Sequence, residues 1–360
     1  MTDTMQTTAP HVPVTLLTGF LGAGKTTLLN AVISNVTGSK IAVIVNEFGE
    51  AGLDHDLIEA VDEDIVLMQS GCLCCSIRGD LSRTLQDLFT RKQEDRVNFD
   101  RVVIETTGLA DPGPILQTFV ADPYLTKNFR IDGVVTVVDA ATGPDTLNRQ
   151  FEAVSQVAMA DLLVLSKADL VSESDRCAFE TRLRSLNQTA EILKADRGVV
   201  PAASLWDLSG MRPQKTDDQA LAWLTLTATN DPLDNLSGLA SSGPPSGPSH
   251  KHDARIGSAS IILHNPIPAA AFDLWLDTLI MLRGPDILRV KGIVHLEDIE
   301  TPFVFHGVQH LFDPPVPLHD WQGTDRQSRI VVIARDMTRA ELVYSLDMLR
   351  AHQHSEIQPV

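Results

Sequence analysis

A glycine-rich segment near the start of the chain has the residue types and spacing of a phosphate-binding loop. Residues 19–26 read Gly-Phe-Leu-Gly-Ala-Gly-Lys-Thr, after the apolar run 14–17 and before the helix-compatible run 27–33. A strand, a glycine-rich turn and a helix in this order direct backbone N–H groups and the positive helix end toward one point, which binds phosphate. The segment therefore predicts a nucleoside triphosphate site. We expect its nucleotide contacts from Gly19, Gly22, Ala23, Gly24, Lys25, Thr26 and Thr27.

A second motif supplies the acid that such a site needs. Glu105 follows the apolar run 102–104 and is itself followed by Thr-Thr-Gly, ending at Gly108. In phosphate-loop proteins a carboxylate at the end of a buried strand acts near Mg²⁺. We expect Lys25 and Glu105 to be the catalytic residues, and Thr26 with Glu105 to hold Mg²⁺. Gly108 is expected to begin a switch segment that follows the γ-phosphate. The alternative for Glu105 is an ordinary solvated acid at the end of a strand.

A third motif concerns the base. Residues 163–169 read Leu-Val-Leu-Ser-Lys-Ala-Asp, which resembles the Asn-Lys-x-Asp guanine motif of GTPases with Ser166 in place of the Asn. The Asp169 carboxylate would accept hydrogen bonds from guanine N1–H and the exocyclic amine, a pair of donors that adenine lacks. Lys167 would lie along the base with its methylene stem. Taken without the other motifs, both residues would be ordinary solvated charges that open a helix.

Three thiols are crowded into one turn after the apolar run 65–69, as Cys72, Cys74 and Cys75. Because no second cysteine pair lies at zinc-finger distance, a closed Cys₄ site within one chain is excluded. What remains is an open, thiolate-rich site for Zn²⁺ or another thiophilic ion, or a redox or buried cysteine turn. Cys177 stands alone in a predicted helix, and we expect it to be a small buried side chain.

Short apolar runs alternate with longer amphipathic ones up to residue 195, which is typical of a doubly wound α/β fold with a mostly parallel sheet. This is the architecture of a P-loop NTPase. The strand candidates besides 14–17 are 41–46, 65–69, 102–106, 133–138, 162–166 and 191–194.

A Ser-, Gly- and Pro-rich stretch then separates a second region with a different pattern. Such a stretch buries too little surface to order itself, so we predict a P-loop domain over 1–229, a flexible linker over 230–255 and a smaller α+β domain over 256–360. The last region is expected to hold strands at 258–263, 287–296, 303–312 and 329–334, a helix at 268–282 and a closing helix from residue 338.

The amino-acid composition limits the classes of partner that we expect for this chain. The chain has 360 residues, 43% of them hydrophobic, and a formal net charge of −18. An acidic protein is repelled by nucleic acid and by anionic membranes, so neither is the expected main partner. No secretory signal and no membrane-length apolar stretch is visible, which favours the cytoplasm.

Together these motifs resemble the CobW family of P-loop GTPases. The resemblance is carried by the phosphate loop, by Asn-Glu-Phe-Gly-Glu at 46–50, by the cysteine turn 72–75, by Glu-Thr-Thr-Gly at 105–108 and by Ser-Lys-Ala-Asp at 166–169. Residues 288–292, Leu-Arg-Val-Lys-Gly, resemble the second domain of that family, so the match spans nearly the whole chain.

The resemblance implies a GTP-hydrolysing metallochaperone that binds zinc or cobalt at the cysteine turn. On this reading GTP, Mg²⁺ and Zn²⁺ or Co²⁺ are its ligands, and Cys72, Cys74 and Cys75 hold the transition metal with Glu50 as a further candidate. Its partner would be a client metalloprotein or metal-insertion complex that contacts the C-terminal domain. No Gln follows Gly108 to orient the attacking water, so slow intrinsic turnover is expected. Glu47, Glu50 and Asp111 are the acids that are chemically able to position that water. Two alternatives are a metal-buffering or sensing module with a nucleotide switch, and a P-loop kinase.

Overall fold

The computed structural model describes residues 11–35, 40–45, 65–69, 77–195, 198–208, 255–309, 311–312, 315–318, 321 and 326–351. The chain divides into two units. The first comprises Met1–Ala140, Ala160–Leu170 and Ile192–Ser209, and the second comprises Ala141–Met159, Val171–Glu191 and Gly210–Val360.

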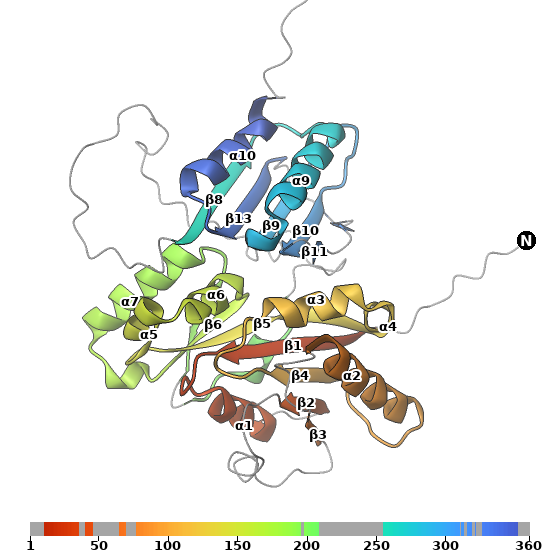
Figure 1. The fold of residues 1–360 in the computed structure, drawn as a ribbon, viewed down its shortest axis with the longest axis vertical. Coiled ribbons are helices and arrows are strands. Elements are labelled where there is room, and N and C mark those ends of the chain that lie inside the picture. Colours follow the sequence, from red (N-terminus) through yellow and green to blue (C-terminus); the bar gives the residue numbers. More distant parts are fainter. Residues whose placement is uncertain are drawn as a thin grey trace, which may run out of the picture. The chain divides into compact units, whose positions relative to one another are not determined.

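The first unit is built on a sheet of seven strands in the order β3-β2-β4-β1-β5-β6-β7 (Figure 1). β1 pairs in parallel with both β4 and β5, and β2 pairs in parallel with β3 and β4. Every strand candidate of this region is confirmed, and the fifth strand begins at Phe129, earlier than expected. The bounds are β1 Val12–Gly19, β2 Ile41–Val45, β3 Ile65–Gln69, β4 Arg101–Glu105, β5 Phe129–Asp139, β6 Leu162–Ser166 and β7 Glu191–Lys194.

Both faces of this sheet are buried. Helix α1 (Lys25–Asn35) packs on one face through a cluster that includes Leu17 and Val103 from the strands. Their chain neighbours Leu16 and Ile104 point to the opposite face and are also buried. Helices α2 (Ile77–Gln93), α3 (Gly113–Ala121) and α4 (Pro123–Asn128) contact one another, and α3 lies on the side of β1 opposite to α1 (Figure 1). Apolar strands covered on both faces are what a parallel sheet requires.

A buried carboxylate fastens the segment after β7 to this sheet. Asp132 is 0% exposed and lies at a bulge in the pairing of β5 with β1. It accepts hydrogen bonds from Arg101 Nη1 (3.0 Å), Arg130 Nη1 (2.8 Å) and the Asp207 backbone N–H (2.9 Å). The Arg101 guanidinium also lies 4.1 Å from the ring centroid of Trp206. The stretch up to residue 208 is therefore part of the first unit's core.

The second unit contains helices α5 (Gly143–Arg149), α6 (Phe151–Met159) and α7 (Glu173–Leu186), and an antiparallel sheet in the order β11-β10-β9-β13-β8. The prediction of one strand over 303–312 is wrong. β10 ends at Val308 and β11 pairs back against it, because Gln309 turns the chain with a φ of 57°. The strand bounds are β8 Ile256–Leu263, β9 Ile287–Val294, β10 Phe303–Val308, β11 Leu311–Phe312, β12 Val316–Pro317 and β13 Ser328–Arg335.

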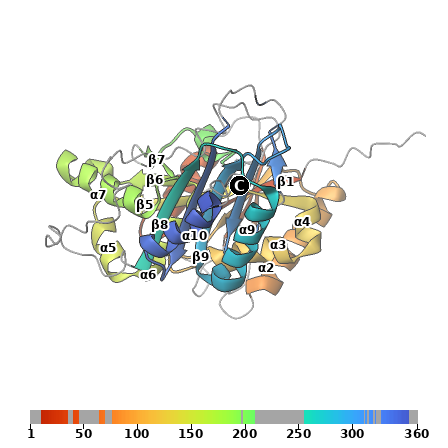
Figure 2. The same cartoon turned by 90° about the horizontal axis from the view of Figure 1, so that it is seen from above.

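Helices α9 (Ala269–Arg283) and α10 (Arg339–Ala351) lie side by side over one face of this sheet (Figure 2). Trp275 of α9 is 1% exposed, and its Nε1–H donates to Ser345 Oγ at 3.1 Å. α10 begins with a capping box, in which the Glu341 N–H donates to Thr338 Oγ1 (3.2 Å) and the Thr338 N–H donates to the Glu341 carboxylate (2.7 Å).

Strand contacts on the other face involve α6 and α7, which contact β9 and β8 respectively. Arg289 of β9 is 4% exposed and donates from Nη1 to the Met159 carbonyl, at 2.6 Å, where α6 ends. The expectation that Cys177 is buried is wrong, because it lies on the exposed side of the amphipathic helix α7. Among the described helices, none combines the length and the apolar character needed to cross a bilayer.

Candidate functional site

The phosphate loop has a backbone shape that depends on glycine. Gly19, Gly22 and Gly24 have φ angles of 139°, 73° and 99°. At Gly19 a Cβ atom would lie 2.3 Å from the Val137 carbonyl oxygen, so β1 and β5 approach too closely there for any side chain. The loop thus leaves β1 in a conformation that residues with a side chain rarely adopt, and α1 begins directly after it at Lys25.

The lysine of the phosphate loop contacts the backbone of the loop itself. Lys25 Nζ donates to the Gly19 carbonyl at 3.0 Å and to the Phe20 carbonyl at 3.4 Å. These are contacts to neutral acceptors, and a phosphate oxygen offers the ammonium group a stronger, charged partner. The lysine is therefore within reach of any phosphate that enters the loop.

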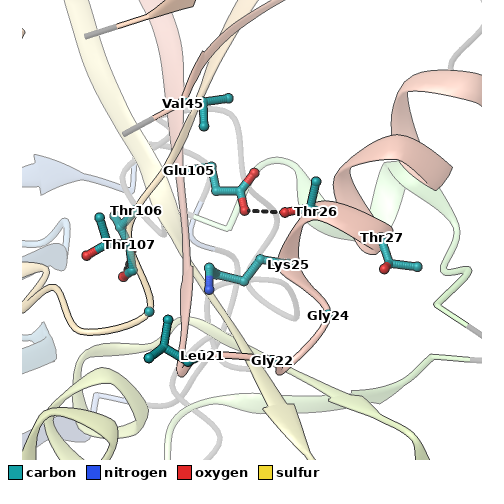
Figure 3. A pocket seen from close by; sticks show the side chains of 11 residues that line it. Leu21, Gly22, Gly24, Lys25, Thr26, Thr27, Val45, Glu105, Thr106 and Thr107 are labelled. Atoms are coloured by element: carbon teal, nitrogen blue, oxygen red, sulfur yellow. Dashed lines mark hydrogen bonds between the residues drawn. The ribbon is translucent and has the colours of Figure 1, made fainter. Parts of the chain in front are cut away.

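The predicted magnesium ligands face each other. Thr26 Oγ1 lies 2.9 Å from Glu105 Oε1, and Figure 3 shows the hydroxyl and the carboxylate directed toward one another. Glu105 is the last residue of β4 and is 5% exposed. A hydroxyl and a carboxylate are oxygen ligands of the kind that Mg²⁺ prefers, so this donor set fits the ion.

The segment after Glu105 is held against the phosphate loop. The Thr106 N–H donates to the Leu17 carbonyl (2.9 Å), and Thr106 Oγ1 donates to Thr18 Oγ1 (2.8 Å). Two residues further on, a Cβ at Gly108 would lie 2.5 Å from the Leu21 backbone nitrogen. Glycine at position 108 therefore allows the two segments to touch.

One candidate for positioning the attacking water has a structural contact of its own. Asp111 Oδ1 accepts from the Gly113 N–H at 2.9 Å, at the start of α3. The other two candidates, Glu47 and Glu50, lie outside the described residues.

These side chains surround one cavity of about 280 Å³. It brings together the phosphate loop, the start of α1, the end of β2 and the segment that follows β4 (Figure 3). The lining residues are Leu21, Gly22, Gly24, Lys25, Thr26, Thr27, Val45, Glu105, Thr106, Thr107 and Gly108. Val45 was not among the sequence-predicted site residues, since nothing in its type or spacing distinguishes it from other strand residues.

The predicted base-recognition turn lies beside the same loop. Ser166 is 6% exposed, and its Oγ donates to the Ala23 carbonyl at 2.7 Å. Lys167 Nζ donates to the Gly22 carbonyl (2.9 Å) and forms an ion pair with Asp139 (2.6 Å). Asp169 is exposed, in a 3₁₀ turn over residues 168–170. Asp139 was not among the sequence-predicted site residues, although an acid directly after the predicted strand 133–138 was a usable signal.

The predicted metal ligands Cys72, Cys74, Cys75 and Glu50 lie outside the described residues. Their flanks are described: β3 ends at Gln69 and α2 begins at Ile77. Gln69 pairs with Val45 of β2, and Val45 pairs with Glu105 of β4. Within the ranges that the structure describes, no group of three or more His, Cys, Asp or Glu side chains is arranged to hold a metal ion.

Comparison with known proteins gives two family matches. The family "CobW/HypB/UreG, nucleotide-binding domain" matches residues 13–194, and "Cobalamin synthesis protein cobW C-terminal domain" matches residues 256–350.

Relatives of known name match along nearly the whole chain. The zinc chaperone YjiA of Escherichia coli (strain K12) is 33% identical over 331 residues, covering 92% of this chain and 96% of that protein. The zinc-regulated GTPase metalloprotein activator 1 of Schizosaccharomyces pombe is 31% identical, covering 92% and 84% of the two chains. The crystal structure of Zn(II)-bound YjiA GTPase from E. coli superposes with a TM-score of 0.70 at 28% identity, covering 95% of this chain and 100% of that one.

Proposed function

The chain belongs to the CobW family of nucleotide-binding proteins, and from that premise we propose that it is a GTPase that carries zinc to a client protein. The observation that carries this proposal is the alignment of three strand ends at one edge of the sheet. Gln69, Val45 and Glu105 are in register on adjacent strands, so the strand that leads into the cysteine turn ends about 10 Å from the backbone of Glu105, whose side chain lines the nucleotide cavity.

For the nucleotide, the glycine turn would receive the β- and γ-phosphates on its backbone N–H groups. The Lys25 ammonium would exchange its carbonyl contacts for phosphate oxygens, which stabilises the charge that develops during transfer of the γ-phosphoryl group to water. Thr26 and Glu105 would hold Mg²⁺. Mg²⁺ held there would supply positive charge that offsets the negative charge of the phosphates.

For the base, Lys167 and Asp169 are the proposed guanine contacts, and the sheet edge supports them because Ser166 and Lys167 both bind carbonyls of the phosphate loop.

The cargo is the transition metal. We assign it to Cys72, Cys74 and Cys75, with Glu50 as a further ligand, because thiolates favour Zn²⁺ over the hard ions Mg²⁺ and Ca²⁺. Co²⁺ would fit the same donors. Thiolate ligands must lose their protons to bind, so the affinity for the metal should fall at low pH.

Coupling between nucleotide and metal follows from their positions along the chain. In the sequence Glu50 lies between β2 and β3, and the cysteine turn lies between β3 and α2. The two segments therefore begin at neighbouring strand ends, Val45 and Gln69. A γ-phosphate that contacts Gly108 would bias this edge toward one arrangement of the ligands, and hydrolysis would release that bias.

The domain assignment is part of the same proposal: a GTPase domain over 1–229, a linker over 230–255 and a C-terminal domain over 256–360. We propose that the C-terminal domain recognises the client, a metalloprotein or metal-insertion complex, and that the protein works in the cytoplasm.

The test measures GTP turnover and Zn²⁺ affinity, with and without a non-hydrolysable GTP analogue, for the full chain and for Cys74→Ser. Cys177→Ser is the matched control, because Cys177 is an exposed cysteine on α7. We expect the analogue to change the Zn²⁺ affinity of the wild type and of Cys177→Ser, and to leave that of Cys74→Ser unchanged. If the wild type binds Zn²⁺ equally with and without nucleotide while GTP is hydrolysed at one rate throughout, the protein is a GTPase switch without a metal cargo.

A further inference from the structure

Asp139 ends β5 at the same level as Ser166 ends β6, since these two residues are register partners. The Asp139 side chain is 5% exposed, and its Oδ2 lies 2.6 Å from Lys167 Nζ. The lysine side chain is 40% exposed, so the ion pair joins a buried acid to a cation at the surface of the site. Burying a carboxylate is costly unless it is paired or hydrogen-bonded, and Lys167 supplies a charged partner.

The same ammonium group also reaches the phosphate loop, through its 2.9 Å hydrogen bond to the Gly22 carbonyl. Lys167 therefore connects the end of β5 with the loop, and both contacts hold the ammonium group at the tip of its stem. A lysine fixed at its tip keeps its methylene groups in one place, where they can form a flat apolar wall.

The backbone of this turn is also restrained. Lys167 has a φ of 53°, a left-handed conformation that is unfavourable for a residue with a side chain. Its carbonyl accepts from the Leu170 N–H at 3.1 Å, which closes the 3₁₀ turn that carries Asp169. The ion pair with Asp139 is one of the contacts that offset the cost of this conformation.

We propose that Asp139 is a positioning residue for guanine recognition. It acts through Lys167: the carboxylate holds the ammonium group, the stem of Lys167 then lies against the base, and the turn keeps Asp169 where it accepts from guanine N1–H and the 2-amino group. The assignment rests on the proposed function, in which GTP is the substrate.

The first test compares Asp139→Asn with the wild type. Asp139→Asn should bind GDP about tenfold more weakly, because the buried charge that holds Lys167 is lost. Its KM for GTP should rise by the same factor while kcat changes little, and its preference for GDP over IDP, which lacks the 2-amino group, should shrink. Affinity for inorganic tripolyphosphate, which has no base, should stay within about twofold of the wild type.

Asp161→Asn is the matched control. Asp161 is a similarly buried acid, 8% exposed, at the other end of β6, where its carboxylate accepts from the Val134 N–H at 3.0 Å. The substitution is the same and the asparagine can keep that hydrogen bond, so we expect wild-type preference for GDP over IDP. If Asp161→Asn loses the preference equally, the effect of Asp139→Asn is a general loss of packing and the assignment is overturned.

Two further variants keep the test decisive if Asp139→Asn folds poorly. Asp139→Glu retains the charge and should recover part of the GDP affinity. Lys167→Met removes the ion pair from its exposed partner and keeps most of the stem, and adding Asp139→Asn to it should cause no further loss. Additive losses would show that Asp139 does not act through Lys167.

Failure of the proposed function gives a different result. A wild type that binds ADP as tightly as GDP would remove the premise and the assignment together. A wild type that prefers GDP, combined with an Asp139→Asn variant that keeps both its GDP affinity and its GDP-over-IDP preference, would overturn the assignment alone.

Discussion

Replacing Ser166 tests how the base-recognition turn divides its hydrogen bonds. A serine hydroxyl has one hydrogen to donate, and Ser166 directs it to the Ala23 carbonyl at 2.7 Å. It then has none for the N7 acceptor of guanine. Ser166→Asn introduces an amide with two N–H donors, so that one can keep the contact with Ala23 and the other can reach the base. One added neutral hydrogen bond contributes about 0.5–1.5 kcal/mol, or about two- to thirteen-fold in the dissociation constant for GDP.

The assay is a calorimetric titration of the wild type and Ser166→Asn with GDP and with 7-deaza-GDP, in which a C–H group replaces N7. The wild type should bind the two ligands with about equal affinity, and Ser166→Asn should prefer GDP. Ser166→Ala is the second variant; it deprives a phosphate-loop carbonyl of its donor and should weaken binding of both ligands alike, by about 1–3 kcal/mol. A wild type that prefers GDP over 7-deaza-GDP by about tenfold would refute the reasoning, because the hydroxyl would then serve the base.

Two other predictions concern stability. Gly19→Ala should lower the free energy of unfolding by about 3 kcal/mol or more, because its Cβ would lie 2.3 Å from the Val137 carbonyl oxygen. Gly22→Ala, with no atom within 4 Å of its Cβ, should lower it by only about 1 kcal/mol. Urea denaturation measures both variants, and equal losses would contradict the steric explanation. Hydrogen bonds from Ser82 and from two backbone N–H groups hold the pKa of Asp122 below its ordinary value. Its contribution to the free energy of unfolding is therefore complete above a pH of about 4 and is lost as the pH falls through the lowered pKa. Asp122→Asn should show a shallower loss of stability as the pH falls below about 4, and an unchanged pH dependence would contradict the assignment.

Much of the fold could be predicted from the sequence, because strands of a parallel sheet are apolar on both faces and stand out as continuous runs. The strand at 162–166 is an example, and its bounds are as expected. The hairpin at 308–311 could not be predicted, since its turn uses Gln309 in a left-handed conformation and no Gly, Asn or Pro marks it. The exposure of Cys177 depends on which face of α7 is buried, and the single cysteine carried no information on that.

Some residues of the candidate site could likewise be predicted from the sequence, and others could not. Residues within a motif, such as Lys25 and Thr26, could be found because their chemistry depends on a fixed local spacing. Asp139 has no such spacing: its relation to Lys167 depends on the pairing of β5 with β6, which only the folded chain establishes. The hydrogen bond of Ser166 to the phosphate loop is likewise a contact between residues far apart in the sequence.

The segment that follows β7 determines how much of the chain the first unit needs in order to keep its core. The family match stops at residue 194, yet Ala195, Val200 and Leu205 belong to the same apolar cluster as α1, and Asp207 donates its amide to Asp132. A protease cut or an engineered stop after Lys194 would expose that cluster to water and leave a buried acid short of a donor. A chain that ends after Leu208 would keep both. The end of the family match and the end of the packed core therefore lie at different residues in this protein.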